Sequence, residues 1–162
     1  MEGPIVFEPA VFGDARGFFV ETFRAEWLPG ESWVQDNHSR SKRSTVRGMH
    51  FQTGQAKLVR CARGRIWDVV VDIRPGSPTF GEWQAWELDD ERLHALYVPV
   101  GFAHGFAVLS DEADVVYKCS TYYDPVQESG FAYDDPAVGI AWPVDEPLVS
   151  ARDRDAPALR AL

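Results

Sequence analysis

The sequence predicts an all-β protein, a sandwich or barrel of the jelly-roll type with few short helices. Segments rich in β-branched and aromatic residues recur along the 162-residue chain at roughly ten-residue intervals, the spacing of short antiparallel strands. Turn signals rich in Gly, Pro and Asp separate them, as at Pro75-Gly76-Ser77-Pro78, because these residues supply fixed or permissive backbone angles. Pro and Gly interrupt every stretch that keeps a helical apolar period.

The first half of the chain is expected to hold six strands and one short helix. Four strands are expected at residues 5–7, 17–23, 32–39 and 45–51, with the helix around residues 25–28. The segment from Lys57 to Arg74 is apolar and β-branched but is broken at Arg63-Gly64. This pattern indicates two strands joined by a tight turn.

The second half is expected to add five strands and an irregular tail. The strands are expected at residues 83–88, 94–98, 105–110, 114–120 and 139–141. Residues 145–162 are rich in Pro and charge, so this tail should fold back over the barrel or fray. No linker or repeat divides the chain, which is long enough to bury one core. We therefore expect a single domain over residues 1–162.

Composition and charge narrow the class of function. The net charge is −9, which argues against binding to nucleic acid or to an anionic membrane, because both need a basic face. No apolar run approaches the length of a bilayer span, and the N-terminus lacks the features of a signal peptide. We expect a cytoplasmic protein. Cys61 and Cys119 are too few for a disulfide framework and are expected to be buried thiols.

The charges are unevenly distributed. Residues 1–81 carry a net charge of +2, and residues 82–162 carry −11. From His38 to Arg65 there are eight Lys and Arg side chains and no carboxylate. This segment favours a focused site for an anion, although it could also lie against the acidic half of the chain.

Two of the four histidines are candidates for a site. His50 ends the apolar segment TVRGMH, where Arg47 places a cation nearby and Gly48 permits a close backbone approach. An imidazole beside such a cation is a plausible general base, although a structural role is equally open. His94 has no companion motif and is expected at the surface, and His38, in the polar and basic stretch DNHSRS, could contact a ligand.

His104 lies in a segment, PVGFAH, that resembles the second motif of the cupin superfamily. Metal-binding cupins hold their ion through an HxH pair, a Glu and a later His, ligands that suit iron, manganese or zinc. Here Gln52 replaces the second His of the pair, and no Glu or Asp occurs between His38 and Trp67. We therefore expect no metal.

Taken in order, the motifs resemble a family of metal-free cupin enzymes, the dTDP-4-dehydrorhamnose 3,5-epimerases of deoxysugar nucleotide biosynthesis. The matching segments are FGDARGFFVETF (12–23), VQDNHSRSKRSTVRGMHFQ (34–52), KLVRCARGRIWDVVVDIRPGSPTFGEW (57–83), YVPVGFAHGFAVLSDEADVVYKCSTYYDP (97–125), YDDPAVGIAWP (133–143) and LVSARD (148–153). The resemblance implies a cupin-type jelly roll that inverts carbons 3 and 5 of a dTDP-4-keto-6-deoxyhexose without a cofactor.

The resemblance also implies the catalytic residues. His50 would remove the proton that the carbon 4 carbonyl acidifies, and Asp153 would orient it and stabilise the imidazolium. Lys57 would stabilise the oxyanion that develops at the keto oxygen. Tyr123, in preference to the adjoining Tyr122, would deliver a proton to the opposite face.

The remaining implied residues bind the substrate. Arg47 would contact the diphosphate or the sugar, since a planar guanidinium suits phosphate. His104 would be a neutral pocket residue near the sugar, with a buried structural role as its alternative. Further residues would line the mouth or reach in from a partner subunit of a homodimer: Gln35, Asn37 and Ser39 at the mouth, and Arg16, Phe19 and Glu21 from the partner, with the ring of Phe19 near the thymine.

Two departures from the family pattern bear on specificity. Only four residues, 53–56, separate Gln52 from Lys57, where relatives commonly carry a longer Pro-containing loop, and the chain stops soon after Asp153. Three other functions stay open at this point. They are a relative that inverts only carbon 3 or carbon 5, a metal-dependent cupin enzyme, and a sugar-nucleotide binding module without activity.

Overall fold

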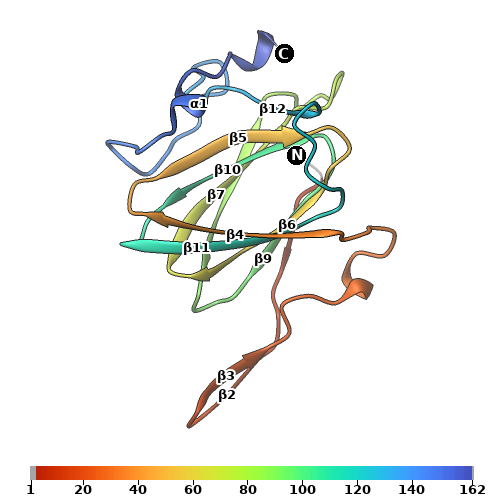
Figure 1. Ribbon diagram of the computed structural model, residues 1–162, viewed down its shortest axis with the longest axis vertical. Coiled ribbons are helices and arrows are strands. Elements are labelled where there is room, and N and C mark those ends of the chain that lie inside the picture. Colours follow the sequence, from red (N-terminus) through yellow and green to blue (C-terminus); the bar gives the residue numbers. More distant parts are fainter. Residues whose placement is uncertain (1–2, 162) are drawn as a thin grey trace.

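The computed structural model describes residues 3–161, and nearly all of its regular structure is β-strand (Figure 1). The strands are β1 (Ile5–Phe7), β2 (Val11–Asp14), β3 (Gly17–Val20), β4 (Gln35–Lys42), β5 (Val46–Gln52), β6 (Lys57–Arg63), β7 (Arg65–Asp72), β8 (Trp83–Asp89), β9 (Ala95–Val98), β10 (Phe102–Val108), β11 (Glu112–Cys119) and β12 (Glu128–Gly130). The helices are short: η1 (Ala25–Trp27), α1 (Ala151–Arg154) and η2 (Leu159–Ala161).

Two five-stranded antiparallel sheets form the body. The strand orders are β1-β9-β6-β11-β4 in the first sheet and β12-β5-β10-β7-β8 in the second. Because consecutive strands often belong to different sheets, the chain crosses repeatedly between the two layers, as in a jelly roll. The structure therefore agrees with the predicted fold class.

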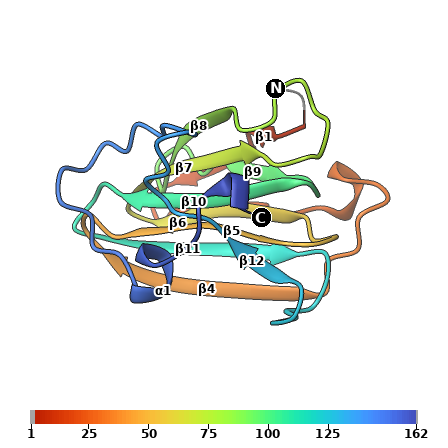
Figure 2. The ribbon, with the colours of Figure 1, turned by 90° about the horizontal axis from the view of Figure 1, so that it is seen from above.

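The main core lies between the two sheets, where alternate side chains of each strand point inward. Its fully buried members include Val59, Ile66, Val70, Leu96 and Val115. A second apolar cluster covers the outer face of the second sheet and includes Met49, Phe131 and Leu159. Leu159 comes from the C-terminal segment, which Figure 2 shows lying over this sheet.

The C-terminal tail folds back over the second sheet, which was one of the two predicted outcomes. Thr45 forms a parallel bridge with Leu148, and the Ala132 amide donates to the Pro157 carbonyl at 2.8 Å. Ser150 caps α1 by accepting a hydrogen bond from the Asp153 amide. These contacts hold α1 beside β5. Among the residues that the structure describes, no helix is long and apolar enough to cross a bilayer.

Some predicted strands differ from the observed ones. Residues 139–141 form coil and not a strand, because Ile140 packs on the second cluster and no strand in the described part of the chain pairs with this segment. β4 starts and ends three residues later than expected, and β10 starts three residues earlier. The sequence did not indicate β12, whose short, Gly-containing segment is a strand only because it pairs with β5.

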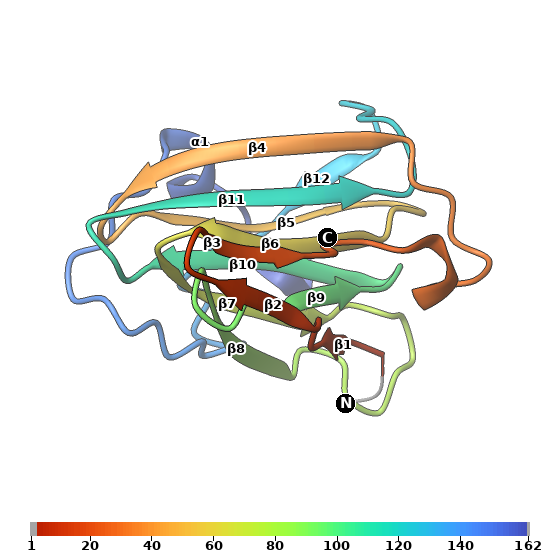
Figure 3. The ribbon, with the colours of Figure 1, turned by 90° about the horizontal axis from the view of Figure 1, so that it is seen from below.

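A hairpin of β2 and β3 stands apart from both sheets (Figure 1), and in the view from below it lies in front of them (Figure 3). It exposes Phe12, Phe18 and Phe19 by 63%, 60% and 67% of their surface. A two-stranded hairpin has little stability alone in water, and clustered exposed aromatics mark an interaction surface. The hairpin thus has the features of an arm that packs against another molecule.

Asp72 organises the turn that follows β7. Its fully buried carboxylate accepts hydrogen bonds from the backbone and guanidinium of Arg74 and from the hydroxyls of Ser77 and Thr79. Burial alone raises the pKa of a carboxyl group, but these donors outweigh it and hold the pKa of Asp72 well below its ordinary value.

Candidate active site

His50, half-buried near the end of β5, forms an acid–base pair with the buried Asp153 of α1. Their Nε2 and Oδ1 atoms lie 2.6 Å apart, and the two side chains are 29% and 6% exposed. Burial on its own raises the pKa of the Asp153 carboxyl, yet its hydrogen bond and charge interaction with His50 hold it below the ordinary value. An ionised carboxylate at this distance orients the imidazole and stabilises its protonated form.

Gly48 makes this pairing possible. Its φ of +143° lies where side chains are rarely tolerated, and a Cβ there would approach the Gly105 Cα of β10 to 2.6 Å. The Gly48 amide also donates to Asp153 Oδ2 at 3.4 Å. The close backbone approach predicted for Gly48 is therefore confirmed, and it brings β5, β10 and α1 together.

A cleft of about 80 Å³ opens beside His50 between the two sheets. Lys57, at the start of β6, lines it and forms no ion pair or hydrogen bond with the residues that the structure describes. Burial lowers the pKa of its ammonium group, against the opposing effect of three nearby acidic groups. An unpaired ammonium in such a cleft is available to an oxyanion.

The cleft also holds residues that sequence reasoning did not single out. Tyr117 points inward from β11, so it stands on the opposite sheet from His50, and burial raises the pKa of its hydroxyl. Glu128 of β12 accepts a hydrogen bond from the Tyr123 hydroxyl at 2.9 Å and forms an ion pair with Arg152 at 3.1 Å. Strand alternation along β11 could have indicated Tyr117, since it lies two residues from Val115 and from Cys119.

The predicted mouth residues occupy the inner face of β4. Gln35 and Asn37 line the cleft and are joined by a hydrogen bond of 3.0 Å. Ser39 lies further along the same face, with a buried hydroxyl that has no partner among the described residues. Arg47 of β5 reaches across to this strand and donates to the Ser41 hydroxyl at 2.9 Å. The structure therefore brings the predicted mouth residues to one wall.

His104 lies opposite His50 in the ladder of β5 and β10. It is buried, and its Nε2 contacts both carboxylate oxygens of Asp68, at 2.9 and 3.0 Å. His104 does not reach the surface of the cleft that His50 lines. The structure thus favours the buried structural role that was the alternative for His104, since its imidazole pairs with Asp68 in the interior and not with the cleft. His38 is exposed on the outer face, and His94 is half-buried.

The basic segment from His38 to Arg65 lies partly against the acidic half of the chain, which was one of its two predicted roles, and the anion site stays a prediction. Four of its cations pair with carboxylates of the acidic second half: Arg40 with Asp114, Arg43 with Asp111, Arg63 with Glu112 and Arg65 with Glu87. Among the described residues, Lys57 forms no ion pair and lines the cleft, whereas Arg47 forms no ion pair and donates to Ser41 of β4. Pairing across the two halves thus leaves Lys57 unpaired at the cleft.

The three residues predicted to act across a subunit interface lie away from the cleft of their own chain. Arg16 and Phe19 are on the projecting hairpin, and Glu21 follows it (Figure 1). Arg16 pairs with Asp14 of the same hairpin, and Glu21 contacts Arg24 at 3.1 Å. Within one chain, the structure does not bring them to His50.

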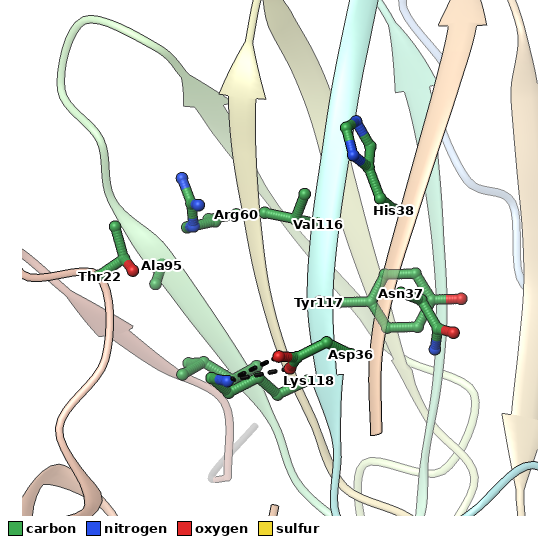
Figure 4. Close-up of a pocket in the computed structure, with 10 residues that line it drawn as sticks. Thr22, Asp36, Asn37, His38, Arg60, Ala95, Val116, Tyr117 and Lys118 are labelled. Atoms are coloured by element: carbon green, nitrogen blue, oxygen red, sulfur yellow. Dashed lines mark hydrogen bonds and ion pairs between the residues drawn. The ribbon is translucent and has the colours of Figure 1, made fainter. Parts of the chain in front are cut away.

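A second hollow, of about 320 Å³, lies over the outer face of the first sheet (Figure 4). Arg60 and Val116 line it, and Lys118 pairs with Asp36 at its rim at 2.9 Å. Thr22, from the segment that follows the hairpin, forms another part of its wall. It contains neither His50 nor Asp153, so this hollow is separate from the acid–base pair. Among the described residues, no three His, Cys, Asp or Glu side chains gather as a metal-ligand cluster.

Comparison with known proteins gives one family. Residues 1–161 match the family profile described as dTDP-4-dehydrorhamnose 3,5-epimerase. A protein of that name from Shigella flexneri is 49% identical over 157 residues, which cover 92% of this chain and 87% of the relative.

Two solved structures extend the comparison. The 3,5-epimerase of Legionella pneumophila, solved with dTDP-4-keto-L-rhamnose, is 44% identical with a TM-score of 0.93, covering 97% of this chain and 88% of the other. The 3'-monoepimerase ChmJ of Streptomyces bikiniensis, solved with dTDP-quinovose, is 43% identical with a TM-score of 0.93, covering 98% and 85%. The profile match over almost the whole chain, with these identities, shows that the chain belongs to the dTDP-4-dehydrorhamnose 3,5-epimerase family.

Proposed function

We propose that the protein inverts carbons 3 and 5 of a dTDP-4-keto-6-deoxyhexose, without a cofactor. The observation that carries this proposal is the contact of 2.6 Å between His50 and Asp153 beside a cleft lined by Lys57. A base, a stabilising carboxylate and a free cation are what proton abstraction next to a carbonyl needs. The family membership of the chain supplies the substrate class.

The proposed reaction has two proton transfers at each carbon. His50 takes the proton from the carbon next to the keto group, and the electrons of the broken C–H bond move to the carbonyl oxygen. Lys57 stabilises the enolate oxygen, and Asp153 stabilises the imidazolium. A proton then returns from an acid on the opposite face, the enolate collapses to the ketone, and the configuration is inverted.

Two tyrosines are candidates for the acid. Tyr117 is supported by its place on the sheet opposite His50 and by a hydroxyl that forms no hydrogen bond with the described residues. Tyr123, the residue that the sequence predicted, lies at the mouth, and its hydroxyl already donates to Glu128. The raised pKa of each hydroxyl keeps it protonated. We favour Tyr117 as the acid, with Tyr123 as the second candidate.

We further propose a homodimer in which the hairpin of one subunit completes the site of the other. Arg16, Phe19 and Glu21 would then meet the nucleotide at the partner's cleft, together with Gln35, Asn37, Ser39 and Arg47 of that subunit. The exposed aromatic side chains of the hairpin support this arrangement.

Mixed dimers test it. Combining His50→Asn subunits with Phe19→Ala subunits creates one intact site in each mixed dimer, so about a quarter of wild-type activity should return on random mixing. A monomer in sedimentation analysis, or no recovery of activity, would contradict the arrangement. A cytoplasmic location stays a prediction.

Proton NMR of the protein with dTDP-4-keto-6-deoxyglucose in deuterium oxide tests the activity. Loss of the carbon 3 and carbon 5 proton signals, unchanged by a chelator, is the expected result. Loss of activity with the chelator would indicate a metal-dependent cupin, and binding without exchange would indicate a non-catalytic module.

A second candidate function is inversion at carbon 3 alone. The specific reason to keep it is the 43% identity with the 3'-monoepimerase ChmJ, close to the 44% identity with the Legionella 3,5-epimerase. Both reactions need the same base and oxyanion group. In the NMR experiment, loss of the carbon 3 signal alone would favour this function.

A further inference from the structure

The short turn between β5 and β6 is tied to the segment of residues 121–124, here called the mouth segment. Gln52 donates from Nε2 to the Tyr122 carbonyl at 2.9 Å and to the Thr121 hydroxyl at 3.0 Å. Its Oε1 accepts from the Asp124 amide at 2.9 Å. Gln55 donates to the Thr121 carbonyl at 3.0 Å. Both glutamines are at least nine-tenths buried.

The turn itself sets the side chains of Gln52 and Gln55 side by side. The backbone N–H of Gln55 donates to the backbone carbonyl of Gln52 at 3.0 Å, and Gly54 takes a φ of +75° that lets the chain reverse within two residues. Both side chains consequently point at the same stretch of backbone. The pair therefore belongs to the connection of four residues between Gln52 and Lys57.

The mouth segment has few other restraints at the point where it carries Tyr123. The Tyr123 side chain is 56% exposed, and its hydroxyl touches Glu128 at the rim of the cleft. Its amide donates to Gln35 Oε1 at 2.9 Å. The carbonyl before Tyr123 and the amide after it are both held by Gln52. The position of the tyrosine ring is therefore determined mainly through its backbone.

We propose that Gln52 and Gln55 are positioning residues that clamp the mouth segment and hold Tyr123 and Glu128 over the reacting sugar. Gln52 stands where a metal-binding cupin would place the second His of its HxH pair. Its amide has both hydrogens and its oxygen bonded to the mouth segment, so it is directed to the backbone of the rim. The inference rests on the proposed epimerase function, because its effect is read as a change in that reaction.

Gln52→Met tests the clamp, because methionine keeps the length of the side chain and removes its hydrogen bonds. A small displacement of a catalytic or substrate-positioning group costs up to about a hundredfold in rate, so kcat should fall by about ten- to a hundredfold. The dissociation constant for dTDP should change by less than about threefold, since Gln52 has no predicted role in holding the nucleotide. Thr53→Ala, on the exposed part of the same turn, is the matched control and should keep wild-type kcat.

A double variant separates positioning from general destabilisation. If Gln52 acts through Tyr123, then Gln52→Met should cost little in a protein that already carries Tyr123→Ala, which removes the ring that the clamp positions. The clamp would be overturned if the double variant lost kcat by the product of the two single losses, or if the Gln52→Met protein kept wild-type kcat. Gln55→Met, which removes only the Thr121 contact, gives the same comparison if Gln52→Met folds poorly. A wild-type protein that exchanges neither proton would instead refute the proposed function, and the clamp with it.

Discussion

Replacing Asp153 by Asn removes the negative charge beside His50 while keeping the shape of the side chain. The Asp153 side chain is 6% exposed and its carboxylate lies 2.6 Å from the imidazole, so water does not replace it easily. Removing one partner of a buried charged pair costs about 3–5 kcal/mol. At about 1.4 kcal/mol for each factor of ten, the imidazolium formed on proton abstraction would form about a hundred- to several-thousandfold more slowly.

The assay is the first-order rate of deuterium incorporation at carbons 3 and 5, followed by proton NMR at saturating substrate. Asp153→Asn should lower both rates by that factor and leave the dissociation constant for dTDP within about threefold, because the change acts on the transition state. Asp145→Asn, an exposed carboxylate of the same tail, is the control. Exchange by Asp153→Asn at more than a third of the wild-type rate would refute the role assigned to the pair.

Three further predictions concern the acid, the stability of the fold and the backbone at the site. Tyr117→Phe should suppress net epimerisation more than first proton exchange, and a larger effect of Tyr123→Phe in the same assay would make Tyr123 the acid. Asp72→Asn should lower the free energy of unfolding by about 3 kcal/mol at pH 7, measured by urea denaturation. Because the pKa of Asp72 is lowered by folding, its contribution is complete above its ordinary pKa of 3.8 and is lost as the pH falls through the lowered value. The difference in the free energy of unfolding between wild type and Asp72→Asn should therefore narrow as the pH falls below 3.8. A difference that stays constant with pH would count against this role of the Asp72 carboxylate. Gly48→Ala should cost about 2–3 kcal/mol and most of the activity, since the backbone angle and the contact with Gly105 both exclude a methyl group; unchanged thermal stability would contradict this.

Runs of β-branched and aromatic residues between turn signals were sufficient to predict most strands. The runs that became β6 and β7 are β-branched on both sides of Arg63-Gly64, and in the structure a bend at Gly64 leads from β6 of the first sheet to β7 of the second. Prediction was weaker where pairing alone makes a strand. Glu128 and Gly130 belong to β12 because β5 lies beside them, and no local preference in that segment would have shown this.

The candidate site shows the same division between local and tertiary information. His50 could be singled out from its neighbours in sequence, but Asp153 lies in a polar tail, 103 residues further along the chain. Only the return of that tail along β5 makes it a partner. Tyr117 was overlooked because a tyrosine in an apolar strand looks like core until the opposite sheet is in view.

The layer architecture and the residue types available for chemistry can be read from the sequence alone. Both follow from short-range pattern: runs of β-branched and aromatic residues, turn residues, and motifs within a few residues of each other. Tertiary packing, by contrast, sets which charges are neutralised and which face the cleft. Arg40 and Arg43 are paired and Lys57 is not, because burial and ion pairing depend on segments that are distant in sequence and adjacent only after the two sheets have packed.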